Sequence, residues 1–157
     1  MARFFSGETP CAICGKPVHA ADDPVLFPPF VQNRRDPLLV FSDAVVHQAC
    51  LDAHPHGDDA LRRVRQILAH TGPGKRRCEV CGEQITDPDD YFGTSYLAPD
   101  SAPVSEFNYI QLHRTHFPQW ARADDFRRAV DAYLSSDAWD GPTVVFDPLP
   151  RFLPKRV

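Results

Sequence analysis

Apolar and polar residues follow one another along this chain in short blocks, and the same succession of blocks occurs twice. In the first half, an apolar segment at residues 25–31, broken by two prolines, precedes a polar loop at 32–37 and a second apolar segment at 38–46. Because proline cannot donate a hydrogen bond to a sheet, residues 25–31 are predicted to form an irregular edge strand. In the second half, residues 91–97 and 107–112 are apolar on either side of a proline-containing loop. The pattern predicts a short strand pair in each half.

Helical periodicity follows each strand pair. The apolar positions at helical spacing are Leu61, Val64 and Leu68 in the first half, and Phe126, Val130, Tyr133 and Leu134 in the second. Paired aspartates at residues 58–59 and 124–125 stand at the predicted helix starts, where carboxylates cap free amides and complement the helix dipole. Each half is therefore predicted to end in an amphipathic helix.

Cysteine and histidine residues repeat together with these blocks. A Cys-x-x-Cys-Gly at residues 11–15 and a His-x-x-Cys at 47–50 are matched by a Cys-x-x-Cys-Gly at 78–82 and a His-x-x-His at 113–116. The first pairs lie 67 positions apart (11 to 78) and the second pairs 66 apart (47 to 113), so one residue has been lost in between. The candidate metal ligands of this internal repeat are Cys11, Cys14, His47, Cys50, Cys78, Cys81, His113 and His116.

Two close pairs of sulfur and imidazole ligands suit a tetrahedral Zn²⁺ that clamps two chain segments together. The glycine after each Cys-x-x-Cys permits a tight turn around the metal. The second pair, at i and i+3, faces one way if it lies on the first turn of a helix. The sequence predicts two structural Zn²⁺ per chain. His54 and His56 are alternative fourth ligands of the first site, and Cys50 is preferred because it aligns with His116.

A knuckle, a strand pair and a helix whose first turn carries the last two ligands resemble a treble-clef zinc finger. The chain also resembles tandem LIM-type proteins and small bacterial zinc proteins, although a LIM domain carries two metal sites per unit and each unit here carries one. The resemblance implies an α+β fold of two tandem zinc-stabilised treble-clef units with a Pro-rich C-terminal extension. The expected boundaries are 1–70 for the first unit, 71–77 for a linker, 78–135 for the second unit and 136–157 for the extension.

Chain length and cysteine content indicate how each half is stabilised and in which cellular compartment the protein is expected. The chain has 157 residues, so each half is marginal on hydrophobic burial alone, and a metal contributing roughly 10–16 kcal/mol would decide whether each half folds. All five cysteines belong to the two ligand sets, and an odd number cannot pair fully into disulfides, so the thiols are expected to be reduced. No segment reads as a signal peptide or a membrane span, and a cytoplasmic protein is expected.

Acidic residues concentrate in one segment of a chain whose formal net charge is -4. Between Cys78 and His113 there are no lysines or arginines, and the carboxylates are Glu79, Glu83, Asp87, Asp89, Asp90, Asp100 and Glu106. Such a surface repels nucleic acid and favours a basic partner. We therefore expect a non-catalytic zinc-stabilised protein-binding module, and an inhibitor or immunity protein that docks a basic partner through this acidic face is the favoured form.

Two other function classes stay open. A nucleic-acid-binding zinc protein would use the helix arginines at residues 62–65 and 127–128, together with the basic residues 75–77. These arginines are expected on the outer faces of their helices. A small metal-dependent nuclease would need a catalytic histidine, for which His54, His56 and His70 are candidates. An enzyme is not expected, because both metal sites can be filled by four protein ligands and no His-Glu-x-x-His motif is present.

Some expectations concern packing alone. Phe41 and Phe107 both stand six residues before a ligand histidine and are predicted to lie in the core beneath each metal. The aspartate pairs are expected to mark turns and helix starts. The C-terminal extension is either a strap over the body or a binding segment, and the strap is favoured because Trp139, Phe146 and Phe152 would otherwise be exposed.

Overall fold

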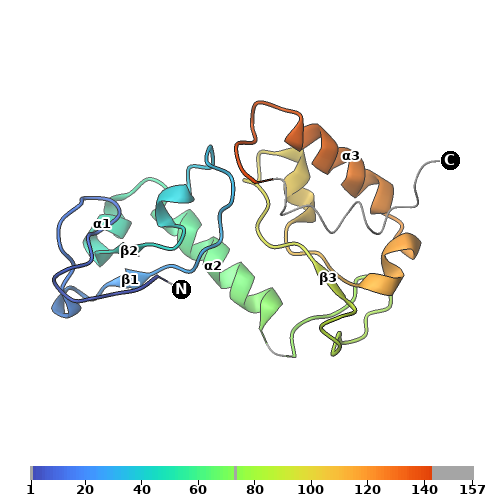
Figure 1. The fold of residues 1–157 in the computed structure, drawn as a ribbon, viewed down its shortest axis with the longest axis horizontal. Helices are drawn as coiled ribbons and strands as arrows, with labels where there is room; N and C mark the ends of the chain where they lie inside the picture. Colours follow the sequence, from blue (N-terminus) through green and yellow to red (C-terminus); the bar gives the residue numbers. More distant parts are fainter. Residues whose placement is uncertain (1, 73, 143–157) are drawn as a thin grey trace. The chain divides into compact units, whose positions relative to one another are not determined.

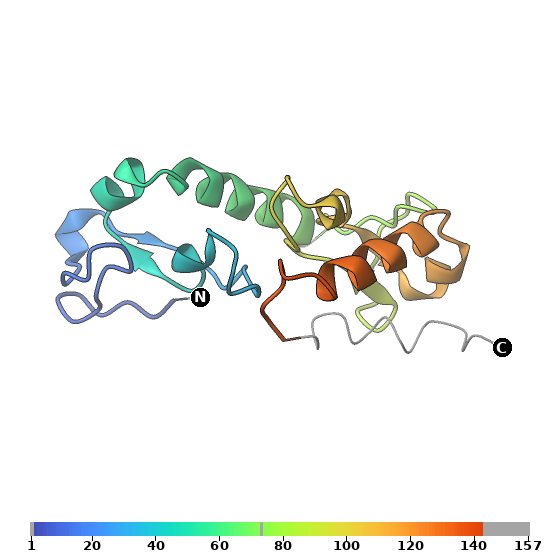
Figure 2. The same cartoon turned by 90° about the horizontal axis from the view of Figure 1, so that it is seen from above.

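The computed structural model describes residues 2–72 and 74–142. It is an α+β structure with short two-stranded sheets, and its contacts divide the chain into two compact units (Figures 1 and 2). One unit consists of Met1–Val31 and Asp36–Gln66, and the other of Gln32–Arg35 and Ile67–Val157. Residues 32–35 therefore group with the second unit, although the chain reaches them from within the first.

The first unit contains one antiparallel strand pair and the start of the longest helix. Its elements are the 3-10 helix Ala20–Asp22, β1 (Val25–Leu26), the 3-10 helix Leu39–Phe41, β2 (Val45–Val46), α1 (Gln48–Ala53) and the first part of α2 (Gly57–Thr71). β1 pairs with β2 with Val25 opposite Val46. β1 thus covers only the first two residues of the edge strand predicted over residues 25–31, because the prolines at 28 and 29 cannot donate to a sheet.

The second unit repeats this order of elements. They are β3 (Tyr91–Gly93), the 3-10 helix Pro103–Phe107, β4 (Gln111–His113), the 3-10 helix Arg114–Gln119 and α3 (Ala123–Leu134). β3 pairs antiparallel to β4 with Phe92 opposite Leu112. Val25 and Phe92 are 67 positions apart and Val46 and Leu112 are 66 apart, so the strand register carries the same offsets as the candidate ligands. The internal repeat is therefore a repeat of backbone structure.

Aromatic side chains form the core of the second unit. Phe126 on α3 lies 5.2 Å from Phe107 and 5.8 Å from Trp120 between ring centroids, and Phe92 packs edge-on against Phe117 at 4.9 Å. Phe41 and Phe107 are both fully buried, which confirms their predicted place in the core. Each unit thus has a small hydrophobic core of its own.

In each unit the first residue of the second ligand pair directly precedes a short helix, and the second residue lies on that helix, which is separate from the long one. α1 ends at Ala53, and His54 adopts an extended conformation (ψ 133°) because it precedes Pro55. In the second unit the chain turns out of the helix at Trp120 (ψ 118°) before α3 begins. The two predicted amphipathic helices follow these breaks.

The two long helices match their predicted faces unequally. In α3, Phe126, Val130 and Tyr133 are buried, as predicted, and Leu134 is partly buried against the same core. In α2, Leu68 is 60% exposed, and the buried residues are Gly57, Ala60 and Arg63, so the predicted face of Leu61, Val64 and Leu68 is wrong for Leu68. Leu68 follows Gln66, the last residue of the first unit, so it lies beyond the part of α2 that covers that unit's core. At the start of the helix, a Cβ on Gly57 would come within 2.1 Å of the Leu51 carbonyl oxygen, so glycine is required for this close approach.

Arg63 also departs from the expected outer face, since its side chain is buried. Its Nη1 lies 3.3 Å from Gln66 Oε1 and its Nε lies 3.5 Å from Asp59 Oδ1. A buried guanidinium beside a carboxylate and an amide cannot serve as a surface contact.

The described part of the extension packs on the second unit. Trp139 is partly buried and its ring lies 5.6 Å from that of Tyr133. Buried Asn33 donates to Tyr133 Oη (2.9 Å) and to the Ala138 carbonyl (2.8 Å), and it accepts from the Asp140 N–H (2.9 Å). Phe146 and Phe152, the other aromatic residues of the predicted strap, lie outside the described residues.

Candidate metal centres

The first cluster brings together Cys11, Cys14, His47 and Cys50, the four ligands expected from the first repeat. Their four ligand atoms all lie within 4.8 Å of one another. His47 Nδ1 is 3.5 Å from Cys14 Sγ and 3.7 Å from Cys50 Sγ. The two cysteines of the knuckle thereby meet His47 and the single cysteine of α1, Cys50, at one point.

The second cluster consists of Cys78, Cys81, His113 and His116, with ligand atoms again within 4.8 Å of one another. Cys81 Sγ lies 3.5 Å from His113 Nδ1, and Cys78 Sγ lies 3.5 Å from His116 Nδ1. The chain therefore carries one Cys3His and one Cys2His2 set.

These distances fit a tetrahedral metal. With metal–sulfur bonds of about 2.3 Å and metal–nitrogen bonds of about 2.0–2.1 Å, tetrahedral geometry places sulfur and nitrogen about 3.5 Å apart. The observed separations of 3.5–3.7 Å agree with that value. Either cluster could hold a metal ion, and a donor set of thiolates and imidazoles is the one that Zn²⁺ prefers.

Each knuckle is closed by backbone hydrogen bonds that recur in the repeat. The Cys11 N–H donates to Lys16 O and the Cys78 N–H to Glu83 O, both at 2.8 Å. Gly15 and Gly82 have φ of 71° and 75°, a left-handed conformation that residues with a Cβ rarely adopt. The glycine after each Cys-x-x-Cys therefore turns the chain so that both cysteines face the same point.

Backbone amides tune the two buried cysteines. Burial acts to raise the pKa of Cys11, but backbone hydrogen bonds from Cys14, His47 and Ile13 lower it from 9.0 to about 6. The pKa of Cys78 is likewise lowered to about 6, where burial is outweighed by backbone hydrogen bonds from His113 and Cys81. The His113 N–H lies 3.3 Å from Cys78 Sγ. The lowered pKa thus favours the thiolate form of one cysteine in each cluster.

A second thiolate in the same cluster is disfavoured. Burial and the neighbouring Cys14 and Cys11 raise the pKa of Cys50 to about 11. Like charges at this distance repel one another unless a cation lies between them. The clusters are therefore electrostatically suited to a bound divalent ion, which would stabilise all the thiolates together.

A carboxylate supports the first cluster from outside. His47 Nε2, the ring nitrogen that faces away from the cysteines, lies 3.2 Å from Pro17 O and 3.6 Å from Asp22 Oδ2. Such a partner orients a ligand imidazole and fixes its tautomer. The counterpart of Asp22 in the repeat, 67 positions on, is Asp89. The neighbour Asp90 instead accepts hydrogen bonds from Thr115, from its N–H at 2.9 Å and its hydroxyl at 3.2 Å. Sequence reasoning treated these aspartates as turn residues and did not find the contact with His47.

His54 and His56, the alternative fourth ligands, are not part of the first cluster. The His54 ring packs edge-on against Phe41 at 4.9 Å, and His56 lies 5.9 Å from His54. His70 stacks on Tyr109 at 5.2 Å. The three candidate catalytic histidines thus make packing contacts.

The acidic segment between Cys78 and His113 is largely exposed. Six of its seven carboxylate residues are exposed, and Asp90 is partly buried. The tertiary structure also brings a cation to this segment, because Arg122 lies 2.6 Å from Glu106 and 3.9 Å from Glu79. The charge of the segment is therefore partly neutralised by a residue distant in sequence.

Carboxylates of the same helix engage most of the helix arginines. Arg62 contacts Asp59, Arg127 contacts Asp124 at 2.7 Å, and Arg128 contacts Asp125. Pairing at i and i+3 lowers the positive potential that these helices could offer to phosphate groups.

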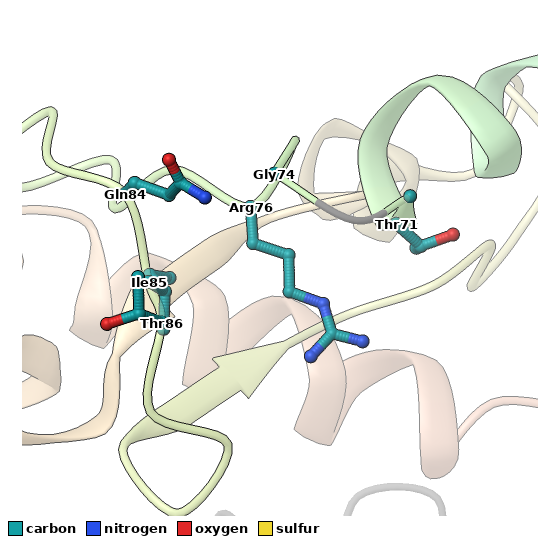
Figure 3. A pocket seen from close by; sticks show the side chains of 7 residues that line it. Thr71, Gly74, Arg76, Gln84, Ile85 and Thr86 are labelled. Atoms are coloured by element: carbon teal, nitrogen blue, oxygen red, sulfur yellow. The ribbon is translucent and has the colours of Figure 1, made fainter.

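A polar pocket of about 330 Å³ lies beside the second knuckle (Figure 3). Figure 3 shows Arg76 extending through it toward β3, with Thr71 on one side and Gln84 and Thr86 on the other. The Arg76 guanidinium lies 4.3 Å above the centre of the Tyr91 ring. The basic residues 75–77 thus include one cation that is held against an aromatic face.

No family model matches this chain, and comparison with curated proteins and with solved structures gives no match. Among the described residues, none of the helices combines the length and the apolar character that a membrane crossing requires.

Proposed function

We propose that this protein is a non-catalytic protein-binding module built from two treble-clef units, each of which holds one structural Zn²⁺. The observation that carries the proposal is that each cluster is a complete set of four ligands with tetrahedral spacing. A zinc that is saturated by four protein ligands keeps no open position for a substrate or a water. Its contribution is to cross-link the knuckle to the helix that follows the strand pair.

A structural role for the metal agrees with the short strands of the two units. The strands of each unit are only two or three residues long. Strand pairs of this length are marginal in water by themselves. Four metal–ligand bonds in each unit would supply the missing stability.

The partner we propose is a basic protein, bound through the exposed carboxylates of the acidic segment. Six exposed acidic residues within one segment support this, as does the pairing of the helix arginines with their own carboxylates. An inhibitor or immunity protein that neutralises a basic enzyme would use such a surface. Charged rim residues of this kind act mainly on the rate of association.

Two double variants test the partner class. Glu83→Lys with Asp89→Lys reverses two exposed carboxylates, and it spares Asp90, whose carboxylate is bonded to Thr115. The matched variant, Arg62→Glu with Arg65→Glu, reverses two exposed helix arginines and spares buried Arg63.

We expect the acidic-segment variant to slow association with the bound partner and to reduce its dependence on salt, while the arginine variant stays close to wild type. Association rates measured at several salt concentrations provide the comparison, with metal content as the control for folding. The opposite order would favour nucleic-acid binding through the helix arginines and residues 75–77. Cleavage of DNA or RNA that depends on an added divalent metal would instead favour the nuclease alternative.

A further inference from the structure

The polar pocket beside the second knuckle contains an arginine whose charge has no polar partner in the described part of the chain (Figure 3). The Arg76 guanidinium lies over the Tyr91 ring, and among the described residues it makes neither a hydrogen bond nor an ion pair. Its neighbours differ, because Lys75 Nζ donates to Leu68 O and Arg77 Nη1 donates to Gly82 O, both at 3.3 Å. Of the three cations at residues 75–77, Arg76 is therefore the one whose head group is available to a ligand.

The position of Arg76 is fixed by its backbone and by its aromatic support. The Ile85 N–H donates to Arg76 O at 2.8 Å, and Arg77 and Gln84 form an antiparallel bridge. The guanidinium lies 4.3 Å from the centre of the partly buried Tyr91 ring. Stacking occupies one face of the guanidinium and leaves the N–H groups at its edge free to donate. The side chain is thus held in advance in a form that suits a planar anion.

Neutral hydrogen-bonding groups line the pocket beside this cation. Gln84 and Thr86 are exposed, and their side chains make no hydrogen bond with any other described residue. An amide and a hydroxyl can each donate and accept. Their acidic neighbours in sequence, Glu83 and Asp87, are not among the residues that line the pocket, and Asp87 Oδ1 accepts the Asp89 N–H at 2.9 Å. The pocket therefore offers one positive charge and neutral polar groups within an acidic segment.

The internal repeat shows that the knuckle does not require these side chains. The Val18 N–H donates to Thr9 O at 2.9 Å, as the Ile85 N–H does to Arg76 O, so the two units share this backbone. At the offset of 67, the pocket residues Arg76, Gln84, Thr86 and Tyr91 are replaced in the first unit by Thr9, Pro17, His19 and Pro24. Neither the cation nor its aromatic support is repeated. The chemistry of the pocket therefore belongs to the second unit and is not part of the shared metal-binding frame.

We propose that this pocket binds a carboxylate group, either of a small organic acid or of a peptide. A guanidinium and a carboxylate form two parallel charge-assisted hydrogen bonds, and the edge of Arg76 is available for them. The volume of about 330 Å³ admits more than the carboxylate, so polar groups next to it in the ligand hydrogen-bond to Gln84 and Thr86. The surrounding acidic residues disfavour a phosphate dianion or a nucleic-acid strand more strongly, because repulsion grows with the charge of the ligand.

NMR titrations of the full chain at constant ionic strength test the proposal. The probe is N-acetylglycine, which carries a carboxylate beside an amide, and N-acetylglycinamide is its uncharged match. We expect saturable shifts of the Arg76 Nε–H and Gln84 side-chain amide signals with the acid, and at least about tenfold weaker binding of the amide. Acid and amide that bind equally, or no saturable shift with the acid, would overturn the proposal. Inorganic phosphate that binds more tightly than N-acetylglycine would overturn the choice of a carboxylate.

Matched variants locate the binding, with the Gln84 amide signals as the readout and metal content as the control for folding. Arg76→Gln should weaken N-acetylglycine binding by at least about tenfold, because the paired hydrogen bonds are lost. Lys75→Gln removes a neighbouring cation that does not line the pocket and should leave the affinity within about twofold of wild type. Arg76→Lys keeps the charge without the fork and should lie between the two. Equal losses in Arg76→Gln and Lys75→Gln would contradict a site at Arg76.

The source of the carboxylate is resolved by comparing N-acetylglycine with N-acetyl-triglycine. A gain of about tenfold in affinity with the longer probe indicates the carboxyl terminus of a peptide, and equal affinities indicate a small acid. Either result supports the carboxylate site. If Arg76→Gln loses its metals, the shifts of the wild-type Arg76 signal still decide whether the site exists, because they report on the residue itself.

Discussion

Replacing Asp22 with asparagine is predicted to weaken metal binding at the first cluster by about tenfold, or about 1.4 kcal/mol. Asp22 Oδ2 lies 3.6 Å from His47 Nε2 and also accepts a hydrogen bond from the His19 N–H at 2.7 Å. Asparagine keeps an oxygen that can accept from His19, so the local turn is preserved while the negative charge is lost. The change therefore isolates the electrostatic support of the ligand imidazole.

The expected loss of metal affinity is set by the other groups that surround His47. Loss of a partner that orients a metal ligand typically costs about 10–100-fold in affinity. The lower end applies here because Pro17 O, 3.2 Å from the same nitrogen, remains in place. The Asp22 side chain is also 38% exposed, so water screens part of its charge.

A competition titration with a chromophoric zinc chelator measures the effect, and Asp89→Asn is the matched control because Asp89 occupies the corresponding position in the repeat. For Asp22→Asn, one of the two metals should be lost at about tenfold lower chelator concentration, and the other should be unchanged. Titrations of both variants that coincide with wild type would show that Asp22 does not support His47.

Two further predictions concern the metals and the core. Elemental analysis should give two Zn²⁺ per chain. The Cys14→Ser variant should lose the first metal and keep the second, whose ligands all come from residues 78–116. Joint loss of both metals would show that the two units fold as one. Phe126→Ala should lower the free energy of unfolding by about 3–5 kcal/mol in urea titrations, because the ring is buried among four other aromatic rings. Leu68→Ala, at a site that is 60% exposed, should change it by less than about 0.5 kcal/mol, and equal losses would contradict the packing described for α2.

The candidate ligands, the internal repeat and part of the core could be predicted from local sequence patterns. Spacing determined the candidate ligands, because Cys-x-x-Cys-Gly favours a left-handed turn at its glycine and i, i+3 pairs face one way on a helical turn. The offsets of 67 and 66 determined the repeat, and the strand registers reproduce them. The burial of Phe41 and Phe107 followed from their equal distance to a ligand histidine. Each of these features depends on residues that are close in sequence or copied between the halves.

Contacts between segments that are distant in sequence determine features that local sequence patterns do not predict. Leu68 is exposed because it follows Gln66, where the first unit ends, and Arg63 is buried beside Asp59 and Gln66. Arg122, which follows the second ligand pair in sequence, partly neutralises the charge of the acidic segment. Residues 32–35 group with the second unit because Asn33 bonds to Tyr133 and Ala138, which lie 100 and 105 positions away. Hydrophobic periodicity reports which residues avoid water, but hydrogen bonds and steric fit between distant segments decide which partners they find.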